Sequence, residues 1–322
     1  MEQKSEQRAV RLAQTISADY LRWAPYLSSE PKLSLAKDQG SSNHTFRLDA
    51  EHESWALRIH RALSPLGVDR IRELRTHSFA ADYGLAPEII YSGAEFLLTR
   101  WLGEEARGSI EKKPQLLTSF LRRLHSLPIA ESETKDALEV SSRLAQFRRL
   151  LPECSLAKAR LVEHNDCLER ATTEVRQTSE QTPARLSLCH NDLNPSNLRI
   201  VNESLLHVNE PNGRHAKNSA KDRAAKAGPR VVALDWEYAS LGHPFHDLAV
   251  ALLPFSPKSK AQLLGDYLGH PANRTELAQF TSFLLVARAL EVSWYQLYAT
   301  ERELQSSIQQ FDDAVHVWVD HR

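Results

Sequence analysis

The spacing of apolar and polar positions changes about one third of the way along the chain. In the first part, residues 5–27 and 68–83 repeat apolar side chains every three or four positions, which predicts two helices. Four short segments have strand-like patterns: residues 45–49, 54–60, 87–91 and 96–102. The first hundred residues or so therefore predict a small unit of mixed helix and sheet.

Beyond this unit, helical spacing dominates, most clearly over residues 116–124, 138–151 and 280–298. Three strand-like segments interrupt the helices: residues 185–189, 197–201 and 230–234. A polar stretch at about 208–229 is predicted to be a solvated hairpin tip or a disordered insertion. Because it contains several lysines and arginines, a basic recognition arm is the alternative interpretation.

These patterns predict an α+β fold with two lobes. The N-terminal lobe covers residues 1–102, contains an antiparallel sheet and begins with a helical extension over residues 1–30. The larger C-terminal lobe covers residues 103–322 and is mainly helical.

Composition narrows the classes of function. The 322 residues include 40 Lys and Arg against 41 Asp and Glu, so the formal net charge is −1. This balance gives no electrostatic reason to expect a nucleic acid or an anionic membrane as a partner. Three cysteines without a CxxC pair indicate neither a disulfide framework nor a zinc ribbon. With no signal-peptide pattern and no apolar run of membrane-spanning length, we expect a soluble cytoplasmic protein, monomeric or homodimeric.

Two motifs at the ends of predicted strands carry the candidate chemistry. In the first, His190 and Asp192 are followed five residues later by Asn197. In the second, an apolar strand ends at Asp235 in the string Asp-Trp-Glu-Tyr-Ala. Phosphoryl transfer needs a carboxylate at the acceptor hydroxyl and hard oxygen ligands for the magnesium ion on the phosphates. Together, the two motifs supply the carboxylate and the oxygen ligands.

In this order, the motifs resemble those of the aminoglycoside phosphotransferase and choline kinase superfamily, and the Asp-Trp-Glu-Tyr-Ala string is typical of its choline- and thiamine-kinase-like branch. The resemblance extends from about residue 33 to the C-terminal helices. It implies a protein-kinase-like fold with a small nucleotide-binding lobe and a larger catalytic lobe, using ATP and Mg²⁺. It further implies that Asp192 is the catalytic base, that Asn197 and Asp235 bind Mg²⁺, and that His190 shapes the loop.

The resemblance also assigns nucleotide-binding residues. Arg58 lies at the strand position where most kinases carry a phosphate-binding lysine, and Glu73 is its expected partner. Arg70, Arg72 and Arg75 could also pair with Glu73, and a surface arginine with an exposed glutamate is the alternative. The expected phosphate-covering loop has a single glycine, and its contacts are assigned to Gly40, Ser41, Ser42 and Asn43. The expected adenine-contacting hinge comprises Thr99, Trp101 and Leu102, with a core role as the alternative.

The acceptor is expected to be a cationic metabolite with a primary hydroxyl. Aromatic faces beside a carboxylate attract organic cations, and helical spacing places Glu291 beside the rings of Trp294, Tyr295 and Tyr298. The residues assigned to the acceptor are Glu291, Trp294, Tyr298, Trp236, Glu237 and Tyr238. Thiamine and choline or ethanolamine both fit, while packing of the aromatic stripe into the core is the alternative. An aminoglycoside or other small-molecule phosphotransferase and a non-catalytic nucleotide-binding protein are the competing functions.

A histidine-rich segment offers a further interpretation. His243, His246 and Asp247 have some metal-ligating character, but the remaining ligands of a zinc site are not found at any fixed spacing. The family resemblance instead implies that Asp247 hydrogen-bonds the catalytic loop from the start of a helix.

Overall fold

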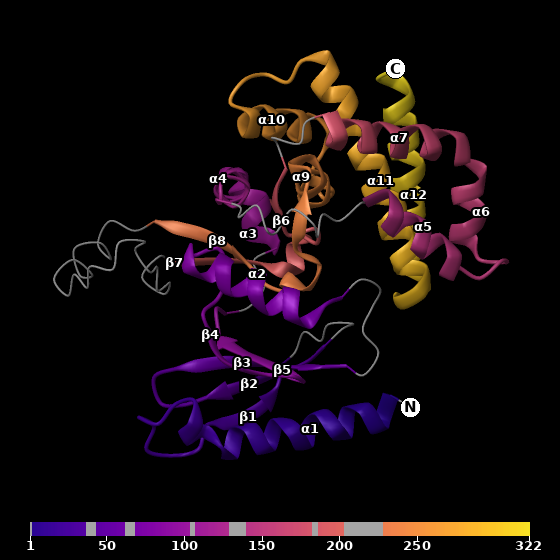
Figure 1. Ribbon diagram of the computed structural model, residues 1–322. Helices are drawn as coiled ribbons and strands as arrows, with labels where there is room; N and C mark the ends of the chain where they lie inside the picture. The colour runs from indigo at the N-terminus through magenta and orange to yellow at the C-terminus, as the bar shows by residue number, and fades with distance from the viewer. Residues whose placement is uncertain are drawn as a thin grey trace. The chain divides into compact units, whose positions relative to one another are not determined.

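A computed structural model (Figure 1) describes residues 2–36, 43–61, 68–103, 107–128, 140–181, 186–202 and 228–322. Internal contacts divide the chain into two compact units. The first comprises Met1–Glu105 and Arg199–Glu237, and the second comprises Ala106–Leu198 and Tyr238–Arg322. The chain thus passes from one unit to the other directly after the first sequence motif, and again within the Asp-Trp-Glu-Tyr-Ala string of the second.

The first unit is built on a five-stranded antiparallel sheet in the order β1-β2-β3-β5-β4. The strands are β1 (Lys32–Leu35), β2 (Asn43–Asp49), β3 (Ser54–His60), β4 (Ile89–Gly93) and β5 (Phe96–Arg100). Helix α1 (Glu2–Ala18) contacts β1, β2 and β3. Its small apolar face packs on the alternating side chains of β2 and β3, and the shared core includes Ala9, Ala13, Phe46, Leu48, Trp55 and Leu57. Period-two alternation in the strands therefore produces one continuous hydrophobic layer beneath the helix.

Helix α2 (Arg70–Asp82) begins at an N-cap that fixes its first turn. The Asp69 carboxylate accepts hydrogen bonds from the backbone N–H groups of Ile71 and Arg72. Such a cap satisfies amides that have no partner within the helix. The buried residues of α2 are polar or small, namely Glu73, His77 and Ala80. Because a buried carboxylate needs a partner, the burial of Glu73 indicates that this helix contributes to a polar site as well as to the hydrophobic core.

A two-stranded ribbon completes the first unit. It consists of β7 (Leu198–Asn202) and β8 (Pro229–Ala233), and the Ala233 N–H donates to the Leu85 carbonyl at 2.9 Å. This bond ties β8 to the segment between α2 and β4. The described residues 199–202 and 228–237 thus belong to the sheet unit, whereas the division from the sequence placed them in the helical lobe.

The second unit is mainly helical and is organised around α11 (Arg274–Tyr298), which contacts α5, α6, α7, α9 and α12. The other elements of this unit are α3 (Arg107–Lys112), α4 (Pro114–His125), α5 (Val140–Leu150), α6 (Leu156–Glu163), α7 (Asn165–Gln181), β6 (Ser187–Cys189), η4 (Pro195–Asn197), β9 (Ser240–Gly242), α9 (Pro244–Leu252), α10 (Pro257–Leu268) and α12 (Glu301–Asp320). A short helix η6 (Trp236–Tyr238) spans the boundary between the units. Helices α11 and α12 each start with a capping box, formed by Asn273 with Glu276 and by Thr300 with Glu303.

The predicted fold class is confirmed, with an antiparallel sheet in one unit and mostly helices in the other. The helix predicted over residues 5–27 ends earlier, at Ala18, and a 3₁₀ turn η1 (Tyr20–Arg22) follows. The insertion expected at about 208–229 lies almost entirely outside the described residues. Among the described helices, none combines the length and apolar character that a membrane crossing requires.

Replacing Phe283 by alanine tests the packing around α11. The Phe283 side chain is 1% exposed, stacks on the His243 ring with 5.0 Å between centroids and meets the Phe245 ring edge-on at 5.9 Å. We expect Phe283→Ala to lower the free energy of unfolding by about 3–5 kcal/mol in urea denaturation, because the cavity cannot close. Val162→Ala, at a side chain 59% exposed, is the control and should change it by less than about 0.5 kcal/mol. Equal effects of the two substitutions would contradict this packing.

Candidate active site

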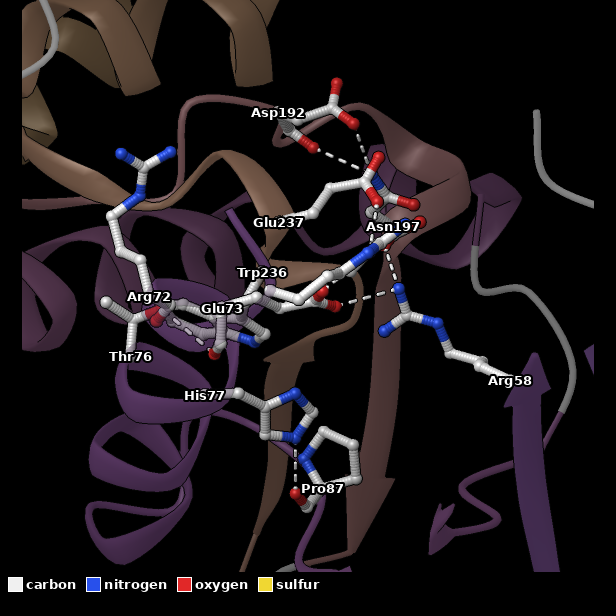
Figure 2. Close-up of polar contacts among 12 residues, drawn as sticks. Arg58, Arg72, Glu73, Thr76, His77, Pro87, Asp192, Asn197, Trp236 and Glu237 are labelled. Carbon is white, nitrogen blue, oxygen red and sulfur yellow. Dashed lines mark hydrogen bonds and ion pairs between the residues drawn. The ribbon is translucent and has the colours of Figure 1, made fainter. Parts of the chain in front are cut away.

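The first unit contains a buried cluster of two arginines and three carboxylates. Arg58, on β3, donates from Nη2 to Glu73 Oε1 at 3.1 Å and also to Asp235 Oδ1 (Figure 2). Burial alone would lower the pKa of Arg58, but the charges of Asp235 and Glu73 raise it overall. Burial alone would raise the pKa of Glu73, and Arg58 with Arg70 lowers it below its usual value. The predicted Arg58–Glu73 pair is therefore present, with both groups charged.

Arg70 extends this cluster to Glu237. Its Nη1 donates to Glu73 Oε2 at 2.6 Å and to Glu237 Oε2 at 3.1 Å. Glu237 is 3% exposed, and its burial, reinforced by the charge of Asp235, raises the pKa of its carboxyl to about 7. The sequence spacing indicated Arg70 only as one possible partner of Glu73. Its contact with Glu237 joins residues 167 positions apart, and no local pattern signals such a pair.

Asp235 follows β8 in a left-handed conformation, with φ of 64°. Such a φ is uncommon for residues other than glycine and is found at functional sites, where the surroundings hold it. The next residue, Trp236, is fully buried and its Nε1 donates to the Ala233 carbonyl at 2.9 Å. The indole therefore fixes the turn that carries Asp235. Trp236 was assigned to the acceptor from the sequence, and here its side chain is buried in the protein.

The acidic members of the cluster have the chemistry of a magnesium site. Carboxylate oxygens of Glu73, Asp235 and Glu237 all lie within 4.8 Å of one another. Mg²⁺ prefers hard oxygen ligands and commonly takes one or two carboxylates together with phosphate oxygens. Asp235 is the most accessible of the three, with 24% of its side chain exposed, against 2% for Glu73 and 4% for Glu237. The donor set therefore fits a magnesium ion, with Asp235 as the leading ligand.

In the second unit, two amide side chains hold the Asp192 carboxylate. Asn197 Nδ2 donates to Asp192 Oδ2 and to the Asp192 carbonyl, both at 2.9 Å (Figure 2). Asn194 Nδ2 donates to Asp192 Oδ1 at 3.0 Å. Because the Asn197 nitrogen is directed to Asp192, its oxygen is the part of the amide that can bind a cation. Asn194 was missed by the sequence analysis, although it lies within the motif and caps η4.

The loop that carries Asp192 is anchored by a buried carboxylate. Asp247, in the first turn of α9, accepts from the backbone N–H of His190 at 2.8 Å and of Asn191 at 2.7 Å. His125 Nε2 lies 3.2 Å from Asp247 Oδ2. Burial alone would raise the pKa of Asp247, but the contact with His125 and the neighbouring groups lower it, so that the carboxylate is charged. The hydrogen bonds expected between Asp247 and the loop that carries Asp192 are thus present.

Asn191 has a left-handed backbone, with φ of 64°, like Asp235 in the other unit. Its Nδ2 donates to the Tyr238 carbonyl at 3.0 Å and to Ser240 Oγ at 2.9 Å. The preceding His190 is fully buried, which agrees with a role in shaping the loop. The motif therefore turns at the buried Asn191, directly before the partly exposed Asp192.

The histidines and cysteine around this anchor have structural contacts. Cys189 lies in a group with His125 and Asp247 whose ligand atoms are within 4.8 Å of one another, but burial holds the pKa of its thiol well above the usual value. His243 Nδ1 accepts from the Phe245 N–H at 3.2 Å and caps α9. Burial lowers the pKa of His246 to about 4, so its imidazole is neutral at physiological pH. Burial therefore favours the neutral thiol of Cys189, and both oxygens of Asp247 already accept from backbone N–H groups.

The residues assigned to the acceptor belong to two elements, η6 and α11. Trp294 contacts the rings of Tyr295 and Tyr298, with centroids 5.4 and 5.5 Å apart. Glu291 accepts from Arg288 Nη1 at 2.5 Å, and 25% of its side chain is exposed. The aromatic group on α11 is thus formed as predicted, but its carboxylate already has a cationic partner from the same helix.

The residues assigned to nucleotide binding lie in or beside the sheet. Asn43 and Thr99 are 2% and 3% exposed, on β2 and β5. The Trp101 N–H donates to the Ser54 carbonyl at 2.9 Å, and the Arg47 guanidinium lies 5.0 Å from the centre of its ring. Leu102 follows outside the strand and precedes Gly103, whose φ is 89°. Gly40, Ser41 and Ser42 lie outside the described residues.

A family model described as "Phosphotransferase enzyme family" matches residues 36–205, which is more than half of the chain. The chain belongs to this phosphotransferase family. The match includes Arg58, Glu73 and the complete motif from His190 to Asn197. No curated protein matches the chain in sequence.

Solved structures of small-molecule kinases share the fold. An ethanolamine kinase from Plasmodium vivax aligns with a TM-score of 0.66 at 14% identity, covering 96% of this chain and 90% of that one. A choline/ethanolamine kinase family protein from Mesorhizobium loti aligns with a TM-score of 0.64 at 16% identity, covering 95% and 98%. A spectinomycin phosphotransferase solved with ADP and spectinomycin aligns with a TM-score of 0.57 at 12% identity, covering 97% and 98%. These likenesses confirm the predicted protein-kinase-like fold, and the family match confirms the predicted superfamily.

Asp247 provides a test of the anchor. In Asp247→Asn, one of the two acceptor oxygens becomes an NH₂ group and faces a backbone N–H that it cannot satisfy. We expect a loss of about 2–4 kcal/mol in the free energy of unfolding at pH 7. Asp266→Asn, at an exposed position on α10, is the control and should leave stability unchanged within about 0.5 kcal/mol. A stable Asp247→Asn protein would show that the loop does not depend on this carboxylate.

Glu237 provides a test of the charge cluster. Its pKa of about 7 exceeds the ordinary value of 4.5, so folding favours the protonated carboxyl. Its contribution to stability is therefore present below about pH 4.5 and is lost as the pH rises through about 7. We expect Glu237→Gln to remove this loss, so the melting temperature of the variant should gain on the wild type between pH 5 and pH 8. Glu51→Gln, at a side chain 84% exposed, should run parallel to the wild type.

Proposed function

We propose that this protein is an ATP- and Mg²⁺-dependent small-molecule kinase that transfers the γ-phosphate to a primary hydroxyl of a cationic metabolite. Family membership supports phosphotransferase chemistry. The single observation that carries the proposal is the fixed Asp192 carboxylate, held by Asn194 and Asn197 on a loop that Asp247 anchors. A group held in this way has the orientation that hydroxyl alignment demands, without reorganisation during the reaction.

Each unit contributes its own residues to the proposed reaction. Asp192 orients the acceptor hydroxyl and accepts its proton, while Arg58 binds phosphate oxygens through a guanidinium that Glu73 holds. Asp235 and Asn197 are the proposed magnesium ligands. When bound, Mg²⁺ would neutralise charge on the phosphate oxygens. Catalysis then rests on positioning and electrostatic stabilisation more than on covalent chemistry.

The second part of the proposal concerns the chemical class of the acceptor, a cationic metabolite. Thiamine, choline and ethanolamine each combine a primary hydroxyl with a positive charge. The proteins of similar fold include ones named as choline and ethanolamine kinases, which favours this class of acceptor. The partly exposed aromatic group of Trp294, Tyr295 and Tyr298 on α11 is the kind of surface that attracts such cations.

Asp192→Asn tests the proposed mechanism. In an ATP-consumption screen with thiamine, choline, ethanolamine, sugars and aminoglycosides, the wild type should consume ATP with at least one cationic acceptor. We expect Asp192→Asn to lower kcat with that acceptor by about 100-fold or more, since a general base typically contributes 10²–10⁴-fold. The rise in melting temperature caused by Mg·ATP should persist in the variant.

Asp166→Asn, at an exposed position on α7, is the matched control and should retain wild-type activity. Full activity of Asp192→Asn would overturn the mechanism. Activity confined to aminoglycosides would replace the acceptor class. Thermal stabilisation by nucleotide without any phosphoryl transfer would instead indicate a non-catalytic nucleotide-binding protein.

A further inference from the structure

An arginine of the second unit lies over the face of Tyr238. Arg143, on α5, places its guanidinium carbon 3.8 Å from the centre of the Tyr238 ring. This separation is well within the range of cation–π attraction. Tyr238 is 5% exposed, so the side chains around it, Arg143 among them, cover nearly all of its surface. The ring therefore already has an organic cation on its face, supplied by the chain.

The covered ring belongs to the segment that supports the proposed catalytic loop. The Tyr238 carbonyl accepts from Asn191 Nδ2 at 3.0 Å, and Asn191 is directly followed by Asp192. A change of partner at Tyr238 therefore occurs beside the backbone that positions the proposed base. Tyr238 is one of the residues assigned to the acceptor from the sequence.

Arg143 differs from Arg58, Arg70 and Arg288 in how its charge is compensated. Arg58 and Arg70 pair with carboxylates, and Arg288 pairs with Glu291. Within the described part of the chain, Arg143 has no carboxylate at ion-pair distance, and its Nε is buried without a hydrogen-bond partner. Its ring contacts are with Tyr238 and, at 5.9 Å, with Phe147 one helical turn along. The Tyr238 ring face is therefore the main group that interacts with the positive charge of Arg143.

We propose that Arg143 is a specificity-determining residue: its guanidinium occupies the Tyr238 face that a cationic acceptor would use, and it thereby weakens binding of cationic acceptors relative to uncharged acceptors of the same shape. This inference rests on the proposed function, because it takes Tyr238 as an acceptor contact. A cationic acceptor must displace Arg143 from the ring and is repelled by its charge. An uncharged acceptor meets no such repulsion.

Choline and its uncharged isostere dimethylbutanol, in which carbon replaces the quaternary nitrogen, separate charge from shape. Dissociation constants are measured by calorimetry for the wild type, Arg143→Ala, Arg143→Lys and Arg149→Ala. We expect Arg143→Ala to bind choline about 2- to 30-fold more tightly, the factor that corresponds to one cation–π contact. The affinity for dimethylbutanol should change by less than about twofold. Arg143→Lys retains the charge and should keep the weak, wild-type affinity for choline.

Arg149→Ala, at an exposed position on the same helix, controls for a general change in charge and should match the wild type. Melting temperatures establish that each variant is folded. The proposal is overturned if Arg143→Ala binds choline no more tightly than the wild type, including the case where neither binds it, or if both ligands gain equally. Tighter binding of choline to Arg143→Ala without phosphoryl transfer from ATP would support this inference while counting against the proposed function.

Discussion

The buried carboxylate of Asp247 is the constraint on which the proposed catalytic loop depends. Two consecutive backbone N–H groups, of His190 and Asn191, point at one side chain from another element. In the interior, each of these donors would cost about 1–3 kcal/mol if it were left without a partner. A charged acceptor is more effective than a neutral one, and the neighbouring His125 helps to keep it charged. The left-handed turn at Asn191 follows from this clamp.

The first unit uses a different device, in which charges of both signs are buried together. Arg58 bridges Glu73 and Asp235, and Arg70 bridges Glu73 and Glu237. Buried ion pairs of this kind contribute little net stability, because desolvation offsets the attraction. Their consequence here is positional. They fix the guanidinium of Arg58 and the carboxylate of Asp235 on elements that are far apart in sequence. The raised pKa of Glu237 reflects its burial first and the neighbouring charge of Asp235 second.

Sequence reasoning reached the parts of the fold and site that local patterns encode. The strands β2 and β3 alternate regularly, and Asp192, Asn197, Asp235 and Asp247 lie in or next to short motifs. The edge strand β1 was missed because it has only four residues, too few for its polar–apolar alternation to stand out, and most of them are exposed. Helix α7 was missed because its buried positions include Ala171 and Thr178, which give a weak apolar signal.

Contacts between distant residues form the part that no local pattern could supply. Arg70 meets Glu237 across 167 positions, and Arg143 meets Tyr238 between α5 and η6. In both cases the sequence indicates the residue types but not their partners, because side-chain pairing is decided by tertiary packing. The same limit applies to Glu291. Helical spacing placed it beside aromatic rings, yet its nearest cation proves to be Arg288, one turn away on the same helix.

These internal pairs change how acceptor recognition has to be understood. With a formal net charge of −1, the whole chain provides no strong field to attract a cation, so selection must come from local groups. At two of the expected positions the cation is already present, as Arg288 at Glu291 and as Arg143 at Tyr238. The binding free energy that a cationic ligand gains at either position is therefore only the difference between its own contact and the arginine contact that it replaces. Under the proposed function, discrimination among small alcohols depends on how firmly each arginine is held: Arg288 by a carboxylate and a carbonyl, and Arg143 by an aromatic face. Under the same proposal, an acceptor displaces the arginine that is held more weakly.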